Sequence, residues 1–285
     1  MAISAPINVP RGTVTAKLNF SHPPKEGQVA FNYVGTPPEG EPQNNVEKYQ
    51  QDVTIEDVRG RESEYTLDND AFQILQDVPE SKETEFTDDE SIKANYYPEV
   101  EKLLLDNIPG SNRIFLFDHT VRRATPDAYR KAVQIVHIDQ TKYSAEKRVR
   151  THMGEDAEKL LQGRYRIVNV WRPLNKNPVE SMPLGFASSA TLDQKDVIPV
   201  EHRYSHGYTG QTAAIAYDPN QKWNYLSGMT GSERLLLECF DSESLKEGTT
   251  VKGGRVAHTA FEHPGSRPDA EGRESIEVRA LVFGP

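Results

Sequence analysis

RYRIVNVWRP (164–173) is the stretch that decides the fold, because its Tyr, Ile, Val and Trp residues favour extended backbone. Val, Ile, Tyr and Trp pack well on a pleated surface, and a proline, which lacks an amide hydrogen, ends a strand. One further run, RLLLECF (234–240), could instead be helical, since a short apolar run has no clear period. Many short strands at this spacing predict a mainly β fold with flanking helices and a jelly-roll core. The further runs, each bounded by turn residues, are TAAIAY (212–217), RLLLECF (234–240), RVAHTAF (255–261) and ESIEVRALVF (274–283).

Three helices are predicted before this stretch. One begins near Pro98 and ends before Pro109, because proline fits the first helical turn and cannot continue a helix. A second opens at TPD (125–127), where the threonine can cap the amide groups of the first turn. A third covers GEDAEKLLQG (154–163), whose last glycine suits a helix C-terminus. These helices are expected to pack beside the β core.

The N-terminal third carries the excess of negative charge. Residues 51–100 hold 15 acidic and 4 basic side chains, a net of −11 in a chain whose net charge is −10. This window predicts a solvated face with flexible loops, and a lid or a homodimer surface are the alternatives. No linker long enough to separate two domains is visible. We therefore predict one domain over 1–285, in which N-terminal strands, acidic loops and helices (1–110) pack on a jelly-roll core (111–285).

Composition excludes several classes of protein. With 43 acidic and 33 basic residues the chain is a poor candidate for sequence-independent binding to nucleic acid. No apolar run approaches the ~20 residues of a membrane span, and the first residues lack the features of a secretory signal. Cys239 is the only cysteine, which excludes an internal disulfide and a cysteine-based zinc site. Hydrolase, P-loop and dinucleotide-binding motifs are also missing. We expect a cytoplasmic protein that acts on a small molecule, without nucleic acid or membrane.

His137 and Asp139 form the only His-x-carboxylate pair in the sequence. With 43 acidic residues in 285 positions, eight histidines are expected to give about one such pair by chance. The pair alone therefore does not indicate a metal site. It lies in AVQIVHIDQT (132–141), which reads as a strand, and side chains two apart on a strand face the same way. An imidazole and a carboxylate would then meet at one point, with Thr141 next on that face. These two groups are part of the 2-His-1-carboxylate set that binds Fe(II). The alternative is that His137 is a structural histidine that only forms a hydrogen bond with the neighbouring Asp139.

The third ligand has to come from far along the chain. His258 is the candidate because it lies in a strand-like run, whereas its neighbour His263 lies in a turn. Arg273 and Ser275 follow and would share one strand face, where a guanidinium group and a hydroxyl form a clamp for a carboxylate. Arg279 falls on the same face and is a second candidate for that clamp.

These pieces, in this order, resemble the Fe(II)/2-oxoglutarate-dependent oxygenases. A closer resemblance covers nearly the whole chain, to the fungal and bacterial family that includes gibberellin A4 desaturase-like proteins, the cephalosporin 7α-methoxylase small-subunit type and fungal hydroxylase/desaturases. That family implies a double-stranded β-helix (cupin-like) core and the oxidation of small molecules in secondary metabolism. The blocks that carry the resemblance are FDHTVRR (117–123), VHIDQT (136–141), GRYRIVNVWRP (163–173), WNYLSGM (223–229), ERLLLECFDS (233–242), HTAF (258–261) and RESIEVRALVF (273–283).

The resemblance implies roles for individual residues. It makes His137, Asp139 and His258 the ligands of Fe(II), and Arg273 with Ser275 the anchor of the co-substrate 2-oxoglutarate, with O2 as the oxidant. Arg279 is an alternative anchor, and Thr141 is expected to line the site. Candidates for contact with the substrate are Asn169, Trp171, Arg172, His119 and Arg122. Each candidate also has a structural alternative. Trp171 could be part of the core, Arg172 could form a structural ion pair, and residues 117–123 could form a salt-bridged loop.

Asp139 also bears on the class of reaction. Halogenating relatives generally lack this carboxylate, so its presence favours hydroxylation or desaturation. Cyclisation, ring expansion or isomerisation at the same iron site is a second hypothesis. A non-catalytic jelly-roll module, or an accessory subunit without turnover of its own, is a third.

Overall fold

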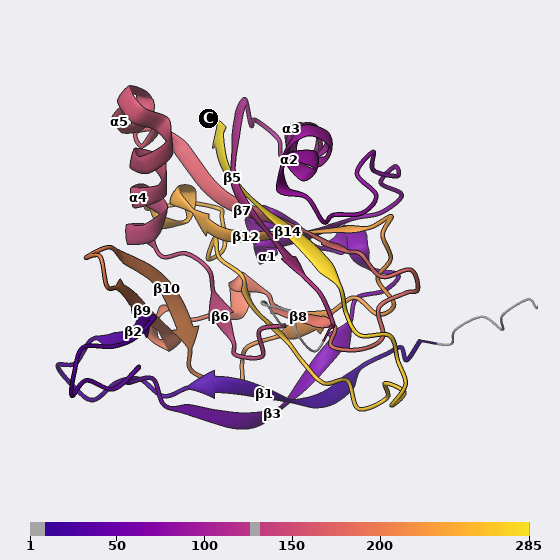
Figure 1. Cartoon of the computed structure of the whole chain (residues 1–285), viewed down its shortest axis with the longest axis horizontal. Coiled ribbons are helices and arrows are strands. Elements are labelled where there is room, and N and C mark those ends of the chain that lie inside the picture. The colour runs from indigo at the N-terminus through magenta and orange to yellow at the C-terminus, as the bar shows by residue number, and fades with distance from the viewer. Residues whose placement is uncertain (1–8, 126–131, 285) are drawn as a thin grey trace, which may run out of the picture.

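Two β-sheets packed face to face make up most of the computed structural model, which describes residues 9–125 and 132–284 (Figure 1). The strands of the larger sheet are, in spatial order, β1 (Val14–Ser21), β3 (Lys48–Asp57), β11 (Trp223–Tyr225), β8 (Leu184–Ala187), β13 (Ala257–Ala260), β6 (His137–Ile138), β10 (Thr209–Ile215), β9 (Val197–Tyr204) and β2 (Ala30–Val34). Those of the smaller sheet are β4 (Phe72–Leu75), β12 (Arg234–Asp241), β7 (Arg164–Pro173), β14 (Ser275–Gly284) and β5 (Arg113–Arg122).

Helices flank the sheets at two places, at the upper left and upper right of Figure 1. The α-helices are α1 (Leu67–Asp70), α2 (Asp89–Ser91), α3 (Tyr97–Asn107), α4 (Lys142–Met153) and α5 (Ala157–Leu160). The remaining turns are the 3-10 helices η1 (Glu62–Glu64), η3 (Gly154–Asp156), η4 (Ser189–Thr191), η5 (Gln194–Asp196) and η6 (Ser242–Leu245), and the π-helical turn η2 (Ile92–Tyr96). Among the described residues, no helix is long and apolar enough to cross a membrane.

The smaller sheet has an apolar outer face and a mixed inner face, because side chains alternate along β14 and β7. On the outer face Val278 and Val168 are fully buried against Val100 and Leu104 of α3. On the inner face, Trp171 packs in a cluster with Phe186 of the larger sheet. The space between the two sheets is therefore a core at one end and, further along, a place for polar side chains.

Helix α4 closes one end of the sheet pair. Its N-terminus has a capping box, in which Thr141 and Ser144 each bond the other's backbone amide. Its apolar side contributes Val149 to a cluster with Ile167 of β7 and Leu281 of β14. The helix thus begins four residues after Ile138, the last residue of β6.

The predicted jelly-roll architecture, mainly β with flanking helices, is confirmed, and RLLLECF is strand β12. The helix from Pro98 is also present, as α3, although a π-helical turn precedes it. Two predictions were wrong in detail. Residues 154–163 contain only η3 and the one-turn α5, after the longer α4. The block 117–123, for which a structural loop was one alternative, lies mostly in β5. The helix predicted to open at 125–127 falls largely outside the described residues.

Candidate active site

Three side chains from two adjacent strands converge between the sheets. β6 and β13 pair antiparallel with His137 directly opposite His258, and their rings lie 4.4 Å apart between centroids. Asp139 follows β6 two residues after His137, so it faces the same way. One ligand atom from each of the three groups lies within 4.8 Å of the others. The strand register thus assembles the two imidazoles and the carboxylate that the sequence predicted.

Backbone carbonyl groups orient both imidazoles. His137 donates from Nδ1 to the carbonyl oxygen of Ile135 at 2.8 Å, and His258 donates from Nδ1 to that of Val256 at 3.3 Å. Since a carbonyl only accepts, each Nδ1 carries a proton, and each Nε2 is the ring nitrogen left to face a metal. Burial, helped by the charge of His137, lowers the pKa of His258 to about 4, so that ring is neutral at physiological pH. Neutral imidazole is the form that binds a metal.

The two oxygens of Asp139 have different surroundings. Oδ2 accepts hydrogen bonds from Asn169 Nδ2 at 2.8 Å and from Arg279 Nε at 3.3 Å, whereas Oδ1 lies 3.3 Å from Nε2 of His137. Burial alone would raise the pKa of Asp139, but the bond from His137 and the charge of Arg279 hold it well below its usual range. Two imidazoles and one ionised carboxylate are the donor set of non-haem Fe(II) sites, so these residues fit that metal.

Arg279, an expected second anchor for 2-oxoglutarate, is already engaged by three carboxylates. Besides its bond to Asp139, it donates from Nη1 to Asp118 at 2.9 Å and from Nη2 to Glu277 at 2.7 Å. These partners fix the guanidinium behind Asp139. A further carboxylate would have to displace one of them, and we therefore assign Arg279 to the support of Asp139.

Arg273 is in the opposite situation. It is only 7 % exposed and lies 5.5 Å from the ring of Trp171, and its Nη1 donates to the carbonyl of Met182 at 2.9 Å. Its Nε is buried and has no hydrogen-bond partner among the described residues. Burial lowers the pKa of Arg273 to about 10, which leaves the group charged. Together with the three candidate ligands it lines one small cavity, of about 340 Å³ with its opening. A buried guanidinium with an unused donor is suited to an incoming carboxylate.

Comparisons with known proteins agree with this geometry. Residues 18–283 match the family model described as an oxidoreductase/YMDC permease-like domain. The hydroxylase/desaturase poxK of Penicillium oxalicum is 38 % identical over 300 residues, which cover 96 % of this chain and 92 % of the relative. The Fe(II)/2-oxoglutarate-dependent dioxygenase nvfI of Aspergillus novofumigatus is 30 % identical over 275 residues, covering 94 % and 96 %.

The chain belongs to this fungal hydroxylase/desaturase family of Fe(II)/2-oxoglutarate-dependent dioxygenases. A solved structure of the iron and alpha-ketoglutarate-dependent endoperoxidase NvfI superposes with a TM-score of 0.87 at 28 % identity, covering 96 % of this chain and 99 % of that one. The family, the fold and the cofactors Fe(II), 2-oxoglutarate and O2 are therefore confirmed.

Three residues predicted at the dioxygenase site lie elsewhere. His119 and Arg172 are on the outer face of the smaller sheet, because their neighbours in β5 and β7 alternate inward. His119 bonds the hydroxyl of Tyr97 at 3.0 Å, and Arg172 lies over the ring of Phe86 at 5.0 Å. Thr141 is the N-cap of α4, since β6 ends at Ile138 and the alternation assumed for Thr141 stops there.

The other predicted residues are in or beside the cavity of the dioxygenase. Trp171 and Arg122 line it, Asn169 holds Asp139, and Ser275 is buried next to Arg273 on the inner face of β14. Sequence reasoning missed Glu277, which also lines the cavity and pairs with Arg279. The same alternation that connects Arg273 with Arg279 would have placed Glu277 between them. Burial, with the nearby charge of Asp139, raises the pKa of Glu277.

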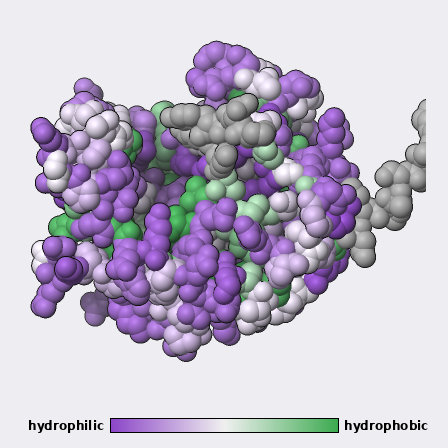
Figure 2. Space-filling model, turned by 60° about the horizontal axis from the view of Figure 1, so that its bottom comes forward, coloured by the Kyte–Doolittle hydropathy of each residue, from purple (hydrophilic) through white to green (hydrophobic). Residues whose placement is uncertain are grey.

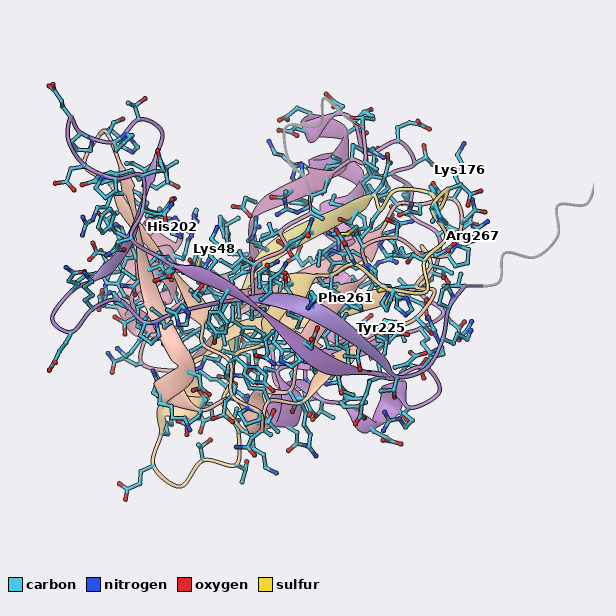
Figure 3. All side chains as sticks on the ribbon, turned by 90° about the horizontal axis from the view of Figure 1, so that it is seen from below. Lys48, Lys176, His202, Tyr225, Phe261 and Arg267 are labelled. Atoms are coloured by element: carbon cyan, nitrogen blue, oxygen red, sulfur yellow. The ribbon has the colours of Figure 1, made fainter. Side chains whose placement is uncertain are left out.

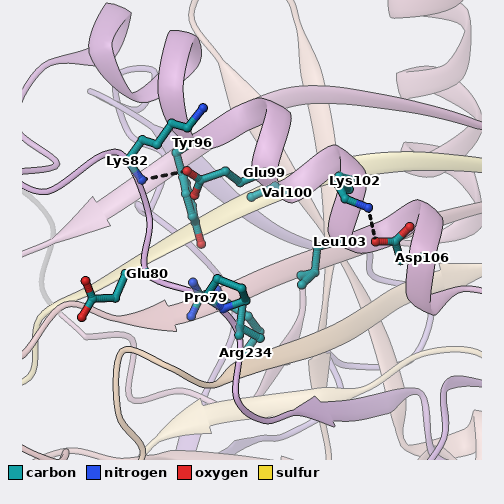
Figure 4. Close-up of a pocket in the computed structure, with 11 residues that line it drawn as sticks. Pro79, Glu80, Lys82, Tyr96, Glu99, Val100, Lys102, Leu103, Asp106 and Arg234 are labelled. Carbon is teal, nitrogen blue, oxygen red and sulfur yellow. Dashed lines mark hydrogen bonds and ion pairs between the residues drawn. The ribbon is translucent and has the colours of Figure 1, made fainter.

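A separate cavity lies on the outer side, beside α3 (Figure 4). Its walls include Tyr96, Val100 and Leu103, with Arg234 at its base. Lys102 bonds Asp106 there at 2.7 Å. None of its lining residues belongs to the cavity of His137 and Asp139, so we do not assign it to the dioxygenase reaction.

Proposed function

We propose that this dioxygenase hydroxylates or desaturates a small molecule of secondary metabolism at the cavity that joins His137, Asp139, His258 and Arg273. The observation that carries the proposal is the meeting of a 2-His-1-carboxylate set and a buried, incompletely bonded arginine in one cavity. The three candidate ligands account for a metal, and the arginine accounts for a dicarboxylate co-substrate. No other cluster of three metal-binding groups occurs in the described parts of the chain.

Each residue has a distinct task in this proposal. His137, Asp139 and His258 would hold Fe(II), which supplies the activation of O2 and the removal of a hydrogen atom when it is bound. Arg273 would bind the distal carboxylate of 2-oxoglutarate through Nε and a terminal nitrogen, with the hydroxyl of Ser275 as a further donor. Trp171 and Leu184 form apolar parts of the wall, which limits water near the reacting groups.

The carboxylate of Asp139 supports the hydroxylase or desaturase outcome. Because Asn169 and Arg279 hold its Oδ2, its Oδ1 stays directed at the two histidines. The relative NvfI is named an endoperoxidase, so this family includes another outcome at the same kind of site. Cyclisation or a similar rearrangement remains the second candidate, and analysis of the product formed from the true substrate distinguishes the two. We also place the enzyme in the cytoplasm, since its single cysteine is buried and unpaired.

An anaerobic titration tests the proposal. Addition of Fe(II) and then 2-oxoglutarate to the purified protein should produce the weak visible charge-transfer band of the chelated co-substrate. The variant Arg273→Ala should need more 2-oxoglutarate to reach the same band, whereas Arg61→Ala, which removes an exposed arginine, should behave as wild type. Folded protein that binds no iron, or gives no band, would contradict the proposal. That result would favour the alternative of an accessory subunit. Decarboxylation of 2-oxoglutarate by the isolated chain would exclude this alternative.

A further inference from the structure

A second cavity adjoins His137, the one residue that it shares with the cavity of Arg273. It measures about 530 Å³ with its opening and lies between β6, β10, β9, β2 and the segment 44–48. Figure 2 shows a recess on this side of the molecule, with hydrophobic residues at its floor inside a mostly hydrophilic surface. The residues that line the cavity are Asn32, Asn44, Val46, Lys48, Ile135, Val136, His137, Val200, His202, Thr212, Ala213 and Ala214.

The floor of this cavity is apolar and faces the candidate iron ligands. Ala214 pairs directly with His137 across β10 and β6, and Val200 pairs with Thr212 across β9 and β10. Residues opposite each other in a sheet share a face, so this wall continues the face on which His137 lies. Val200 and Ala214 are only 5 % and 6 % exposed. An apolar molecule in this cavity would therefore lie against the edge of the metal centre.

The rim carries polar side chains that have no partner. The side chains of Asn32, Asn44 and Lys48 make no hydrogen bond or ion pair within 9–125 and 132–284. Figure 3 shows Lys48 and His202 on the same side of the molecule, and both line this cavity. His202 is held by a hydrogen bond of 2.8 Å between its Nε2 and the hydroxyl of Thr212. The side chains of Asn32, Asn44 and Lys48 thus leave unused donors and acceptors beside the apolar floor.

The charge of the lining is unusual for this protein. Lys48 is present, but none of the twelve lining residues is acidic, in a chain with 43 acidic and 33 basic residues. Lys17, Lys93, Lys102 and Lys142 each pair with a carboxylate, whereas Lys48 has no such pair among the described residues. An ammonium group at the mouth of an apolar cavity without acidic groups favours a negatively charged ligand.

We propose that this second cavity binds the substrate of the dioxygenase, and that the substrate is an apolar small molecule with a carboxylate or equivalent anionic group that pairs with Lys48. The inference rests on the proposed function, because it takes His137 as an iron ligand and the Arg273 cavity as the place of 2-oxoglutarate. With that cavity occupied, the apolar floor beside His137 offers the substrate a place next to the metal. Asn32 and Asn44 supply further hydrogen bonds to oxygen atoms of the substrate.

A probe of defined chemistry tests this inference without knowledge of the natural substrate. The protein is loaded with Mn(II) and 2-oxoglutarate, and the 19F relaxation of 6-fluoro-2-naphthoate is measured against its neutral amide, 6-fluoro-2-naphthamide. Mn(II) should accelerate the relaxation of bound naphthoate more than Mg(II) does, which reports closeness to the metal. The wild type should bind naphthoate more tightly than naphthamide.

Substitution of Lys48 then identifies the charged partner. Lys48→Met should weaken the binding of naphthoate by about two- to fivefold and leave that of naphthamide unchanged, as expected for one exposed charge pair. Lys176→Met, which removes an exposed lysine elsewhere (Figure 3), is the matched control and should change neither. Equal binding of naphthoate to wild type and Lys48→Met, or no preference of the wild type for naphthoate, would overturn the inference.

Failure of the proposed function gives a different result in the same samples. Electron paramagnetic resonance first measures binding of Mn(II) alone, with His258→Ala beside the wild type. If the wild type binds no Mn(II), or His258→Ala binds it equally well, the assignment of the metal centre is wrong. If Mn(II) binds as expected but naphthoate shows no Mn(II)-dependent relaxation, the metal centre stands and the second cavity is not the substrate site.

Discussion

Replacement of Asn169 by alanine should weaken metal binding without altering any candidate ligand. Asn169 donates from Nδ2 to Oδ2 of Asp139 at 2.8 Å, and Arg279 supplies the other bond to that oxygen at 3.3 Å. The alanine variant keeps the longer bond and loses the shorter one. The carboxylate of Asp139 can then rotate, and its Oδ1 is no longer held toward His137.

The expected size of the effect follows from two independent magnitudes. A hydrogen bond to a charged group contributes ~1.5–3 kcal/mol. Loss of a group that orients a metal ligand typically reduces metal affinity 10- to 100-fold, which is ~1.4–2.8 kcal/mol. The two ranges overlap, and because Arg279 remains in place we expect a rise of ~10- to 30-fold in the dissociation constant for the metal.

Cobalt(II) is a convenient probe for this measurement, since its visible bands report both affinity and ligand geometry. Titrations of metal-free wild type and Asn169→Ala at one pH and salt concentration give the ratio of dissociation constants. Asn107→Ala is the control, because it removes a half-buried amide that bonds a carbonyl at 2.9 Å within α3. A folded Asn169→Ala variant with wild-type cobalt affinity and an unchanged spectrum would refute the reasoning.

Further predictions concern the other parts of the structure. His258→Ala should abolish tight metal binding in a calorimetric titration while the far-ultraviolet circular dichroism spectrum is retained. Arg273→Lys should weaken 2-oxoglutarate binding ~10-fold or more in the metal-loaded protein, because a lysine cannot bind a carboxylate with two nitrogens. Glu238 is fully buried, and burial with the charge of Asp241 raises its pKa well above the usual value. The folded protein therefore keeps this proton after the unfolded chain has lost it near pH ~4.3, so stability falls as pH rises above that value. Urea midpoints at pH 5 and pH 8 should differ less for Glu238→Gln than for wild type.

Alternation of apolar and polar residues in the sequence predicts the strands that have one clear apolar face. β14 and β7 were predicted with nearly their observed bounds for this reason. β11 and β8 have only three and four residues, too few for a period, and they form because longer neighbours offer them hydrogen-bonding edges. β3 carries many polar residues because part of it is exposed. Such strands depend on the assembled sheet and are not visible in the local sequence.

The candidate ligands could be predicted because spacing on a strand determines where they point. The roles of Arg279 and Asn169 could not, because both depend on a strand neighbour that is distant in sequence. Arg279 pairs in register with Asn169 of β7 and Asp118 of β5, and this arrangement directs it to Asp139. The misplacement of Thr141 has another cause, since its hydroxyl caps α4 and the sequence alternation had been extended through that cap.

The short length of β6 has a consequence for how the gene can change. The register of this strand is set by the bridge between Asn19 and Ile135 just before it, by one pair with β13 and by two pairs with β10. One residue inserted immediately before His137 would turn the imidazole to the side now filled by Ile138, which is fully buried, and bring a side chain of the wrong kind to the metal. The exposed turn at 205–207 has no such constraint. Length variation among descendants of this gene should therefore accumulate at that turn and be absent from the segment that leads into β6.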